Sequence, residues 1–343
     1  MRAPGFWFLP PQRRDLRALL LAPLGRLYAA ATARRLRRGD EGAYRASVPV
    51  ICIGNLNVGG VGKTPTVMAL VQRLAARGLT AHVVTRGHGG RLQGPVRVDD
   101  RRHSAAETGD EPRLLAAFGP VWVAKDRAAG VRAAEAAGAR IILLDDGFQN
   151  PSVAKDLSLV VVDAEQGFGN GLCLPAGPLR EPVETGLARA DAVLSIGPAG
   201  AQAGFRGLWG GALGSLPHLT ARLAPLDTGM DWRGARVLAF AGIGNPAKFF
   251  DTLRAEGAEL VRAEALDDHQ PLSQALLARL EAEAFALDAQ LVTTEKDAAR
   301  LPPAFRPRVL TLVVRLEFDA PEALDHLLAP LLPPMPPSVP PQA

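Results

Sequence analysis

The sequence predicts an α/β fold of two doubly wound domains, the second smaller and Rossmann-like, with an N-terminal amphipathic helix ahead of them. Two observations predict this class. After residue 46, short β-rich runs alternate with helical stretches, and a second series of the same kind begins near residue 235. Alternating strands and helices form a parallel sheet covered by helices on both faces. The chain has 343 residues, which is enough for two such domains.

The expected elements follow from these runs. The first series predicts strands at 48–53, 81–85, 120–124, 140–144, 158–163 and 191–195, and helices at about 63–77, 107–117 and 127–138. The second series starts in 235–253 and continues with strands at 289–294 and 308–315. We divide the chain into an N-terminal segment (1–46), a first domain (47–215), an extended linker (216–232), a second domain (233–315) and a C-terminal helix with a Pro-rich tail (316–343).

Composition and charge limit the classes of function. Two cysteines, Cys52 and Cys173, give no disulfide framework in a chain of this length, so a reducing compartment is expected. Residues 1–46 hold ten Arg against three acidic residues, a net charge of +7, whereas the whole chain carries +4. Because the excess positive charge lies in one segment, the pattern argues against a broad nucleic-acid surface and for a local electrostatic contact.

The same N-terminal segment has the pattern of an amphipathic helix. Its apolar residues fall near one helical face, and they are Leu16, Leu19, Leu20, Leu24, Leu27 and Tyr28. Arginines interrupt the apolar run well before the roughly 20 residues that cross a bilayer. Two interpretations stay open from this segment alone: a basic helix lying on an anionic membrane surface, or a terminal helix packed on the first domain with its arginines in solvent.

Residues 48–66, "VPVICIGNLNVGGVGKTPT", join a predicted strand to a predicted helix through a Gly-rich corner. The strict phosphate-binding pattern G-x-x-x-x-G-K-[ST] ends at Gly62, Lys63 and Thr64, but Asn57 stands where its first Gly would be. Asn tolerates the unusual backbone dihedrals of such a corner. Backbone N–H groups of the loop would cradle phosphates, and the loop consists of Asn57, Val58, Gly59, Gly60, Val61 and Gly62. Lys63 would reach the β- and γ-phosphates and Thr64 would ligate Mg²⁺, which makes the first domain a P-loop domain.

Two carboxylates complete the predicted nucleotide site. In "RIILLDDGFQ" a buried strand ends in Asp145 and Asp146. The carboxyl ends of parallel strands face the crevice in which ligands bind. One of the two carboxylates would hold Mg²⁺ or its water, as in phosphoryl-transfer sites generally.

Several segments come in a characteristic order. They are "GNLNVGGVGKTP", "TRGHGGR" (85–91), "TGDEP" (108–112), "DDGFQ" (145–149), "GFGNGLCLPAGPLREP" (167–182), "GIGNPAKFF" (242–250), "DDHQP" (267–271) and "TTEKDAAR" (293–300). Together they closely resemble the tetraacyldisaccharide 4′-kinase family of lipid A biosynthesis, over roughly residues 10–315. The "GFGNGLCLPAGPLREP" stretch and the "GKTP" loop are the most specific of these segments.

The resemblance implies an activity and a location. The activity is ATP- and Mg²⁺-dependent phosphorylation of the 4′-hydroxyl of a lipid A disaccharide 1-phosphate, which gives lipid IVA. The implied architecture is two α/β/α domains joined by a two-stranded linker. An N-terminal helix would hold the chain peripherally to the cytoplasmic face of the bacterial inner membrane, so the expected partners are the glycolipid and the membrane surface. Neither a nucleic acid nor an obligate protein partner is expected.

The resemblance also assigns roles to residues by motif match. Asp110 in "TGDEP" aligns with the catalytic aspartate of the family, and His269 in "DDHQP" aligns with the histidine that supports it. Arg180 and Glu181 in "LREP" align with positions near the phosphates and the metal. Gln270 stands where the family commonly has a second His, so another group could assist the base in place of His269.

Two other classes fit the loop. "GGVGKT" also resembles ATPases and GTPases that partition cargo or mature metalloenzymes, although that class often carries a Lys where this chain has Val58. The guanine-reading pattern N-K-x-D is not matched by "TTEKD", in which Lys296 and Asp297 are adjacent. The other alternative is a soluble small-molecule kinase whose N-terminal helix serves only for packing.

Overall fold

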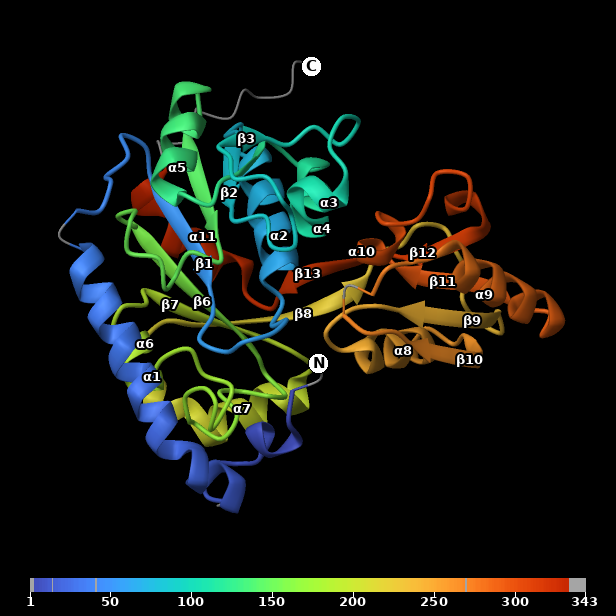
Figure 1. Ribbon diagram of the computed structural model, residues 1–343, viewed down its shortest axis with the longest axis horizontal. Coiled ribbons are helices and arrows are strands. Elements are labelled where there is room, and N and C mark those ends of the chain that lie inside the picture. Colours follow the sequence, from blue (N-terminus) through green and yellow to red (C-terminus); the bar gives the residue numbers. More distant parts are fainter. Residues whose placement is uncertain (1–2, 14, 41, 269, 333–343) are drawn as a thin grey trace, which may run out of the picture.

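A nine-stranded sheet forms the centre of the larger body in the computed structural model, which describes residues 3–13, 15–40, 42–268 and 270–332 (Figure 1). In spatial order its strands are β13 (Val314–Phe318), β8 (His218–Pro225), β7 (Ala192–Ile196), β6 (Leu157–Asp163), β1 (Val50–Gly54), β5 (Ile141–Asp145), β2 (Ala81–Thr85), β4 (Val121–Val123) and β3 (Val96–Arg97). The strands from β8 to β4 are parallel, and β13 and β3 run antiparallel at the two edges.

Helices cover both faces of this sheet because its central strands are apolar on both sides. The described helices are α1 (Leu16–Asp40), α2 (Lys63–Ala75), α3 (Ala105–Thr108), α4 (Asp110–Ala116), α5 (Arg127–Ala136), α6 (Val183–Leu187), α7 (Ala199–Leu213), α8 (Pro246–Ala255), α9 (Gln274–Ala286), α10 (Glu295–Ala298) and α11 (Pro321–Leu328). Short 3-10 turns lie at Gly5–Phe8, Arg306–Arg308 and Ala329–Leu331.

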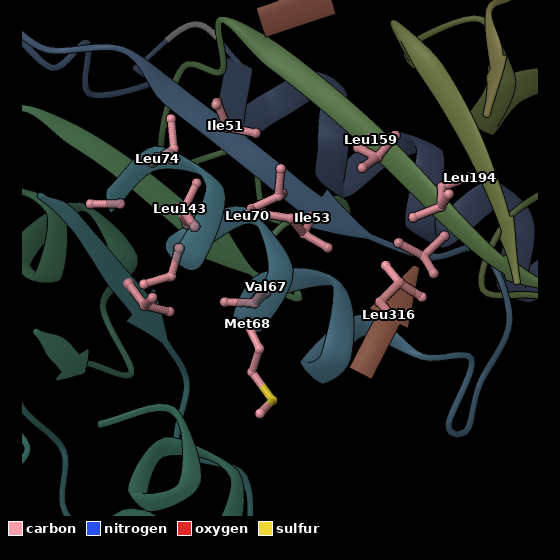
Figure 2. Packing of buried hydrophobic residues seen from close by; sticks show 14 of the residues in the cluster. Ile51, Ile53, Val67, Met68, Leu70, Leu74, Leu143, Leu159, Leu194 and Leu316 are labelled. Atoms are coloured by element: carbon pink, nitrogen blue, oxygen red, sulfur yellow. The ribbon is translucent and has the colours of Figure 1, made fainter. Parts of the chain in front are cut away.

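Alternate residues of β1 point to different cores. Ile51 and Ile53 pack with α2, α4 and α11 on one face, as Figure 2 shows for Leu70 and Leu74 of α2. Val50 and Cys52 pack on the opposite face, against residues of α5, α6 and α7. Burial of a large aliphatic side chain contributes about 1.5–3 kcal/mol. The strand that leads into the Gly-rich loop is therefore held rigidly from both sides.

The smaller body contains a parallel four-stranded sheet in the order β10 (Glu259–Ala265), β9 (Arg236–Ala241), β11 (Gln290–Thr294) and β12 (Val309–Leu312). Phe249, Phe250 and Leu253 of α8 cover one face. Leu277 and Leu280 of α9 cover the other. The predicted class of two doubly wound α/β units with an N-terminal helix is confirmed.

One antiparallel strand pair joins the two bodies. β8 leads from the large sheet toward the smaller body, and β13 returns from it to pair with β8 (Figure 1). The predicted strand 308–315 is in fact two strands in different sheets, β12 and β13, separated at Val313. The predicted linker 216–232 contains β8, a strand of the large sheet. We propose that the interdomain boundary lies where β8 and β13 leave that sheet, and that α11 belongs to the first domain.

The N-terminal helix α1 lies along the outside of the large body (Figure 1). Its buried residues are small: Ala18, Gly25 and Thr32. A Cβ atom at Gly25 would come within 2.8 Å of the carbonyl oxygen of Cys173, so the helix approaches the domain too closely for a larger residue there. Five of its seven leucines are exposed, and among them Leu16 is 78% exposed, Leu20 is 80% exposed and Leu27 is 68% exposed. Among the described residues, no helix has the length and apolarity needed to span a membrane.

Candidate active site

The Gly-rich corner forms a phosphate-sized loop between β1 and α2. Gly59 (φ 105°) and Gly62 (φ 97°) have left-handed backbone conformations that favour glycine. Gly62 also lacks room for a side chain, because a Cβ atom there would lie 2.5 Å from Cδ1 of Ile196. Thr66 donates its hydroxyl hydrogen to the carbonyl oxygen of Gly62 at 2.8 Å and fixes the first turn of α2. The N-terminus of α2 therefore points its backbone N–H groups and its positive dipole end at the loop.

Lys63 begins α2 and faces the end of β5. Its Nζ lies 3.5 Å from Oδ1 of Asp146, and Nη1 of Arg180 lies 2.9 Å from the same oxygen. Burial acts to raise the pKa of Asp146, but the positive charges of Lys63 and Arg180 outweigh it and lower that pKa. Asp146 is thus an ionised carboxylate held between two cations. Its φ of 51° is unusual for a residue other than glycine.

Asp145 lies deeper, at the last position of β5. Its Oδ2 accepts a hydrogen bond of 2.9 Å from the hydroxyl of Thr85, and its backbone carbonyl oxygen accepts one of 3.3 Å from Arg127. Burial, together with the nearby carboxylate of Glu111, raises the pKa of Asp145 to about 6. Two adjacent carboxylates at a strand end therefore have different electrostatic environments.

The oxygen donors near the loop fit Mg²⁺. Mg²⁺ is usually held by one or two carboxylates, water and substrate phosphates rather than by a full set of protein ligands. Thr64, Asp145 and Asp146 supply such oxygens on the wall of one cleft. Within the described part of the chain no group of three or more His, Cys, Asp or Glu side chains could hold a metal alone.

Two residues that were predicted to contact the nucleotide or the metal do not reach the cleft. The described residues that line the cleft include neither Asn57 nor Glu181. Asn57 is buried, and its side-chain amide donates to the carbonyl oxygen of Gly167 at 3.0 Å. Glu181 is buried against Arg189, with Nη2 2.6 Å from Oε2, and accepts 2.9 Å from Gln149. We propose that both residues position the loop and the end of β5 rather than contact the ligand.

Asp110, at the start of α4, reaches the second body. Nε of Arg300 lies 3.3 Å from Oδ2 of Asp110, and both side chains are about 10% exposed. Arg300 also donates to the backbone oxygen of Gln270, which follows His269 in sequence. His269 itself lies outside the described residues. One arginine therefore joins the predicted catalytic carboxylate to the segment that carries the predicted supporting histidine.

The neighbour of Asp110 takes part in a second interdomain contact that the sequence did not indicate. Glu111 lines the cleft, and its Oε1 lies 3.4 Å from Nζ of Lys296, while Oδ1 of Asp268 lies 3.6 Å from the same nitrogen. Glu111 thus lies on the wall of the cleft, whereas Asp110, the residue before it, is not among the described residues that line it. Lys296 was visible in the "TTEKD" segment, but its partner could not be inferred without the tertiary structure.

The cleft has a volume of about 970 Å³ and its walls come from both bodies. Its walls include Val58 to Thr64, both carboxylates at the end of β5, and Arg180. Six cationic residues on its wall were not predicted as site residues: Arg35, Arg86, Lys125, Arg127, Lys248 and Lys296. Lys125 holds the loop after β2 by donating to the carbonyl oxygens of Gly87 and Gly90, each at 3.2 Å. Lys125 directly follows the predicted strand 120–124, and a basic residue at the end of a strand could have marked it as a site residue from the sequence.

Strand, Gly-rich loop, Lys-Thr pair, helix and acidic strand end together define a P-loop nucleotide-binding protein. Comparison with known proteins makes the class more specific. The model of the tetraacyldisaccharide-1-P 4′-kinase family matches residues 17–332. This chain belongs to the tetraacyldisaccharide 4′-kinase family, and it is a kinase.

Individual relatives agree with this assignment. The tetraacyldisaccharide 4′-kinase of Dinoroseobacter shibae is 65% identical over 97% of this chain and 98% of its own length. The enzyme of the same name from Jannaschia sp. is 60% identical over 93% of this chain and 95% of its own. A crystal structure of LpxK from Aquifex aeolicus in complex with ATP has a TM-score of 0.71 at 24% identity, covering 92% of this chain and 99% of that one. This comparison shows that this chain and the Aquifex aeolicus protein share a fold.

Proposed function

We propose that this chain transfers the γ-phosphate of ATP to the 4′-hydroxyl of a tetraacyldisaccharide 1-phosphate, giving lipid IVA. The observation that carries the proposal is the composition of this cleft. Its walls combine the Gly-rich loop, Lys63, the Asp145–Asp146 pair and Glu111, and Asp110 precedes Glu111 in sequence at the start of α4. Membership of a family named for this reaction supports the same acceptor.

The cleft residues have separable roles in this reaction. The 4′-oxygen forms a bond to the γ-phosphorus. The bond from that phosphorus to the β,γ-bridging oxygen breaks, and ADP leaves. Asp110 takes the proton of the attacking hydroxyl. Lys63 and Arg180 stabilise the negative charge that develops on the transferring group. Mg²⁺, when held by Thr64 and one of Asp145 and Asp146, supplies further charge neutralisation on the phosphates.

The acceptor enters from the α1 side of the cleft. Tyr28 and Arg35 of α1 line it, and so do Asn150 and Pro151, which follow the acidic pair. A Cβ atom at Gly39 would lie 2.2 Å from Cγ of Pro151, so the end of α1 is in tight contact with this wall. A glycolipid held along α1 would therefore present its sugar to the reactive end of the cleft while its acyl chains stay outside.

The exposed face of α1 is the proposed membrane contact. Its leucines point away from the domain, so packing on the protein does not account for them. Arg34, Arg35, Arg37 and Arg38 are exposed near its C-terminal end and would face anionic head groups. We place the protein peripherally on the cytoplasmic face of the bacterial inner membrane, where both ATP and the glycolipid are accessible.

A product assay tests this function. The protein is incubated with ATP, Mg²⁺ and detergent-dispersed tetraacyldisaccharide 1-phosphate, and the glycolipid is examined by mass spectrometry. We expect a product heavier by one phosphate group, and fragmentation that places it on the non-reducing sugar. A deacylated disaccharide 1-phosphate serves as the comparison acceptor. Equal turnover of the soluble acceptor would favour a small-molecule kinase instead.

A further inference from the structure

Arg300 closes the "TTEKDAAR" segment and follows α10 in the smaller body, and its charged side chain is only 10% exposed. Its guanidinium group contacts three separate parts of the chain. Nε lies 3.3 Å from Oδ2 of Asp110, and Nη1 donates to Oδ1 of Asp297 at 3.1 Å. Nη2 donates to the backbone oxygen of Gln270. The described residues that line the cleft do not include Arg300, so any part it has in the reaction acts through these neighbours.

The smaller body fixes the direction of this guanidinium group. Asp297 is fully buried, and its Oδ2 accepts hydrogen bonds of 2.9 Å from the backbone N–H of Gly242 and 2.9 Å from the hydroxyl of Thr294. A Cβ atom at Gly242 would lie 3.1 Å from Oδ1 of Asp297, so the backbone after β9 packs directly against this carboxylate. The donors of a guanidinium group lie in one plane at fixed angles. Arg300 therefore presents its Nε–H to Asp110 in a direction that Asp297 and its partners set.

Other contacts bring α10 against the larger body without touching Asp110. Oε2 of Glu295, the first residue of α10, lies 2.6 Å from Nη1 of Arg315 in β13, a strand of the large sheet. From α4, Nη1 of Arg113 donates to the backbone oxygen of Ala299 at 3.5 Å. The pair of Arg300 and Asp110 is thus one of several contacts between the two bodies. What sets this pair apart is that it holds the carboxylate that the proposed reaction uses as its base.

The direction of the Asp110 carboxylate matters for the proposed proton transfer. A general base acts only within hydrogen-bond reach of the proton that it takes, and a misplacement of about 1 Å can lower a rate on the order of 10²-fold. A charge-assisted hydrogen bond from a fixed donor removes much of the rotational freedom of an aspartate side chain. A lysine would supply the same charge as Arg300, but its single ammonium group lacks the planar fork that reaches three acceptors at once.

We propose that Arg300 is a positioning residue for the phosphoryl transfer: it fixes the Asp110 carboxylate toward the acceptor hydroxyl, and Asp297 fixes Arg300 in turn. The proposal rests on the proposed function, which takes Asp110 as the base. It extends the site into a segment of the smaller body in which no residue was predicted to act. It also makes the hydrogen bonds of Asp297 to Gly242 and Thr294 part of the site rather than a local turn.

A double-mutant cycle separates positioning of the base from structural support. Arg300→Gln is measured alone and in the Asp110→Asn background, and Arg113→Gln, which removes a contact between α4 and Ala299, is the matched control. The values of kcat and of both KM are determined with Mg²⁺-ATP and detergent-dispersed tetraacyldisaccharide 1-phosphate. Arg300→Gln should lower kcat on the order of 10²-fold and change KM for ATP by less than about twofold. Arg113→Gln should leave all three values close to those of wild type.

The two changes should not be additive, because Arg300 acts through Asp110. In the Asp110→Asn background, Arg300→Gln should lower kcat no further. If Arg300→Gln unfolds at a lower urea concentration than wild type, Arg300→Lys replaces it in the same cycle and should give the same pattern with a smaller loss. An unchanged or raised kcat, an equal loss in both backgrounds, or a rise in KM for ATP alone would overturn the positioning role and leave the proposed function standing. A wild type that transfers no phosphate to the glycolipid would refute the proposed function, and the positioning role with it.

Discussion

At the scale of single residues, Lys63 is positioned by charge before any nucleotide arrives. Its partner Asp146 also binds Arg180, so two cations and one carboxylate await the phosphates. Replacing Lys63 with Ala removes a preorganised charge on the transferring group, and we expect kcat to fall on the order of 10²-fold or more. Arg222→Ala, at an exposed position of β8, is the control. Near wild-type turnover of Lys63→Ala would mean that the loop only shapes the turn.

Asp110 and Glu111 allow a direct comparison of two adjacent carboxylates. We expect Asp110→Asn to lower kcat strongly with little change in ATP affinity, because the group acts on the acceptor hydroxyl. Glu111→Gln should have the smaller effect on kcat, since the proposed reaction passes the proton of the hydroxyl to Asp110 and leaves Glu111 paired with Lys296. Steady-state kinetics with both substrates varied separates these outcomes. The reverse ranking would make Glu111 the base, and loss of ATP binding in Asp110→Asn would place Asp110 at the metal.

The structure brings the predicted site residues of the two local motifs to one cleft. Lys63, Thr64, Asp145 and Asp146 all line the cleft because strand ends and a helix start put them there. Asn57 belongs to the loop and Glu181 to the "LREP" segment, but their side chains bond to Gly167 and Arg189 instead. Whether a motif residue faces the ligand or supports the loop depends on tertiary packing, which spacing along the chain does not encode.

At the scale of elements, the helix α2 is anchored at its far end by the C-terminal helix α11. Asp325 accepts from Nε of Arg73 at 2.6 Å and pairs with Arg77 at 2.6 Å. Asp325→Asn weakens this partly exposed network, and we expect about 1 kcal/mol less stability in urea unfolding. Arg222→Ala, which breaks an exposed pair with Glu317, is the control and should change stability by less. If both variants lose the same stability, α11 is held to α2 by apolar packing alone.

The same pair predicts a pH dependence. The hydrogen bond from Arg73 outweighs burial and lowers the pKa of Asp325. A carboxylate with a depressed pKa stabilises the fold above its unfolded value of about 3.9, and that contribution is lost as pH falls through the folded pKa. The stability gap between wild type and Asp325→Asn should therefore be constant near pH 6–7 and shrink below about pH 4. A gap that widens on acidification would contradict this assignment.

The helix α1 tests the membrane proposal. Arg34, Arg37 and Arg38 changed together to Gln spare the apolar face and leave the cleft residue Arg35 in place. Each basic residue near an anionic surface contributes up to about 1 kcal/mol, so partitioning to anionic vesicles at low salt should fall roughly tenfold or more. The matched Arg→Lys triple variant should retain binding. Unchanged partitioning of the Gln variant would remove the electrostatic part of the proposal.

Most elements were predictable because their periodicity is local, and two departures show the limit. The predicted helix 107–117 is broken into α3 and α4 at Gly109, whose φ is 93° and whose Cβ would lie 2.5 Å from the carbonyl oxygen of His88. The apolar run 308–315 changes sheets between β12 and β13. In both places a contact with a distant segment decides the break, and a window of sequence does not contain that segment.

At the scale of the whole molecule, the cleft depends on two bodies meeting across it. Asp110 pairs with Arg300, Glu111 with Lys296 and Asp163 with Lys248. Each pair joins a residue of the larger body to one of the smaller body. The sequence predicted two domains, but these pairings could not be predicted from it, because they join positions far apart along the chain. The proposed reaction therefore needs both bodies. The larger body binds the phosphates, and the smaller body contacts Asp110 through Arg300.

The fate of the γ-phosphate tests the central claim most directly. ATP labelled in its γ-phosphate is mixed with the protein, with or without tetraacyldisaccharide 1-phosphate, and the label is followed in lipid and aqueous fractions. The account predicts that label appears at the 4′ position of the glycolipid in step with ADP formation, and that little ATP is consumed without the acceptor. Release of label as inorganic phosphate at the same rate with and without glycolipid would contradict it.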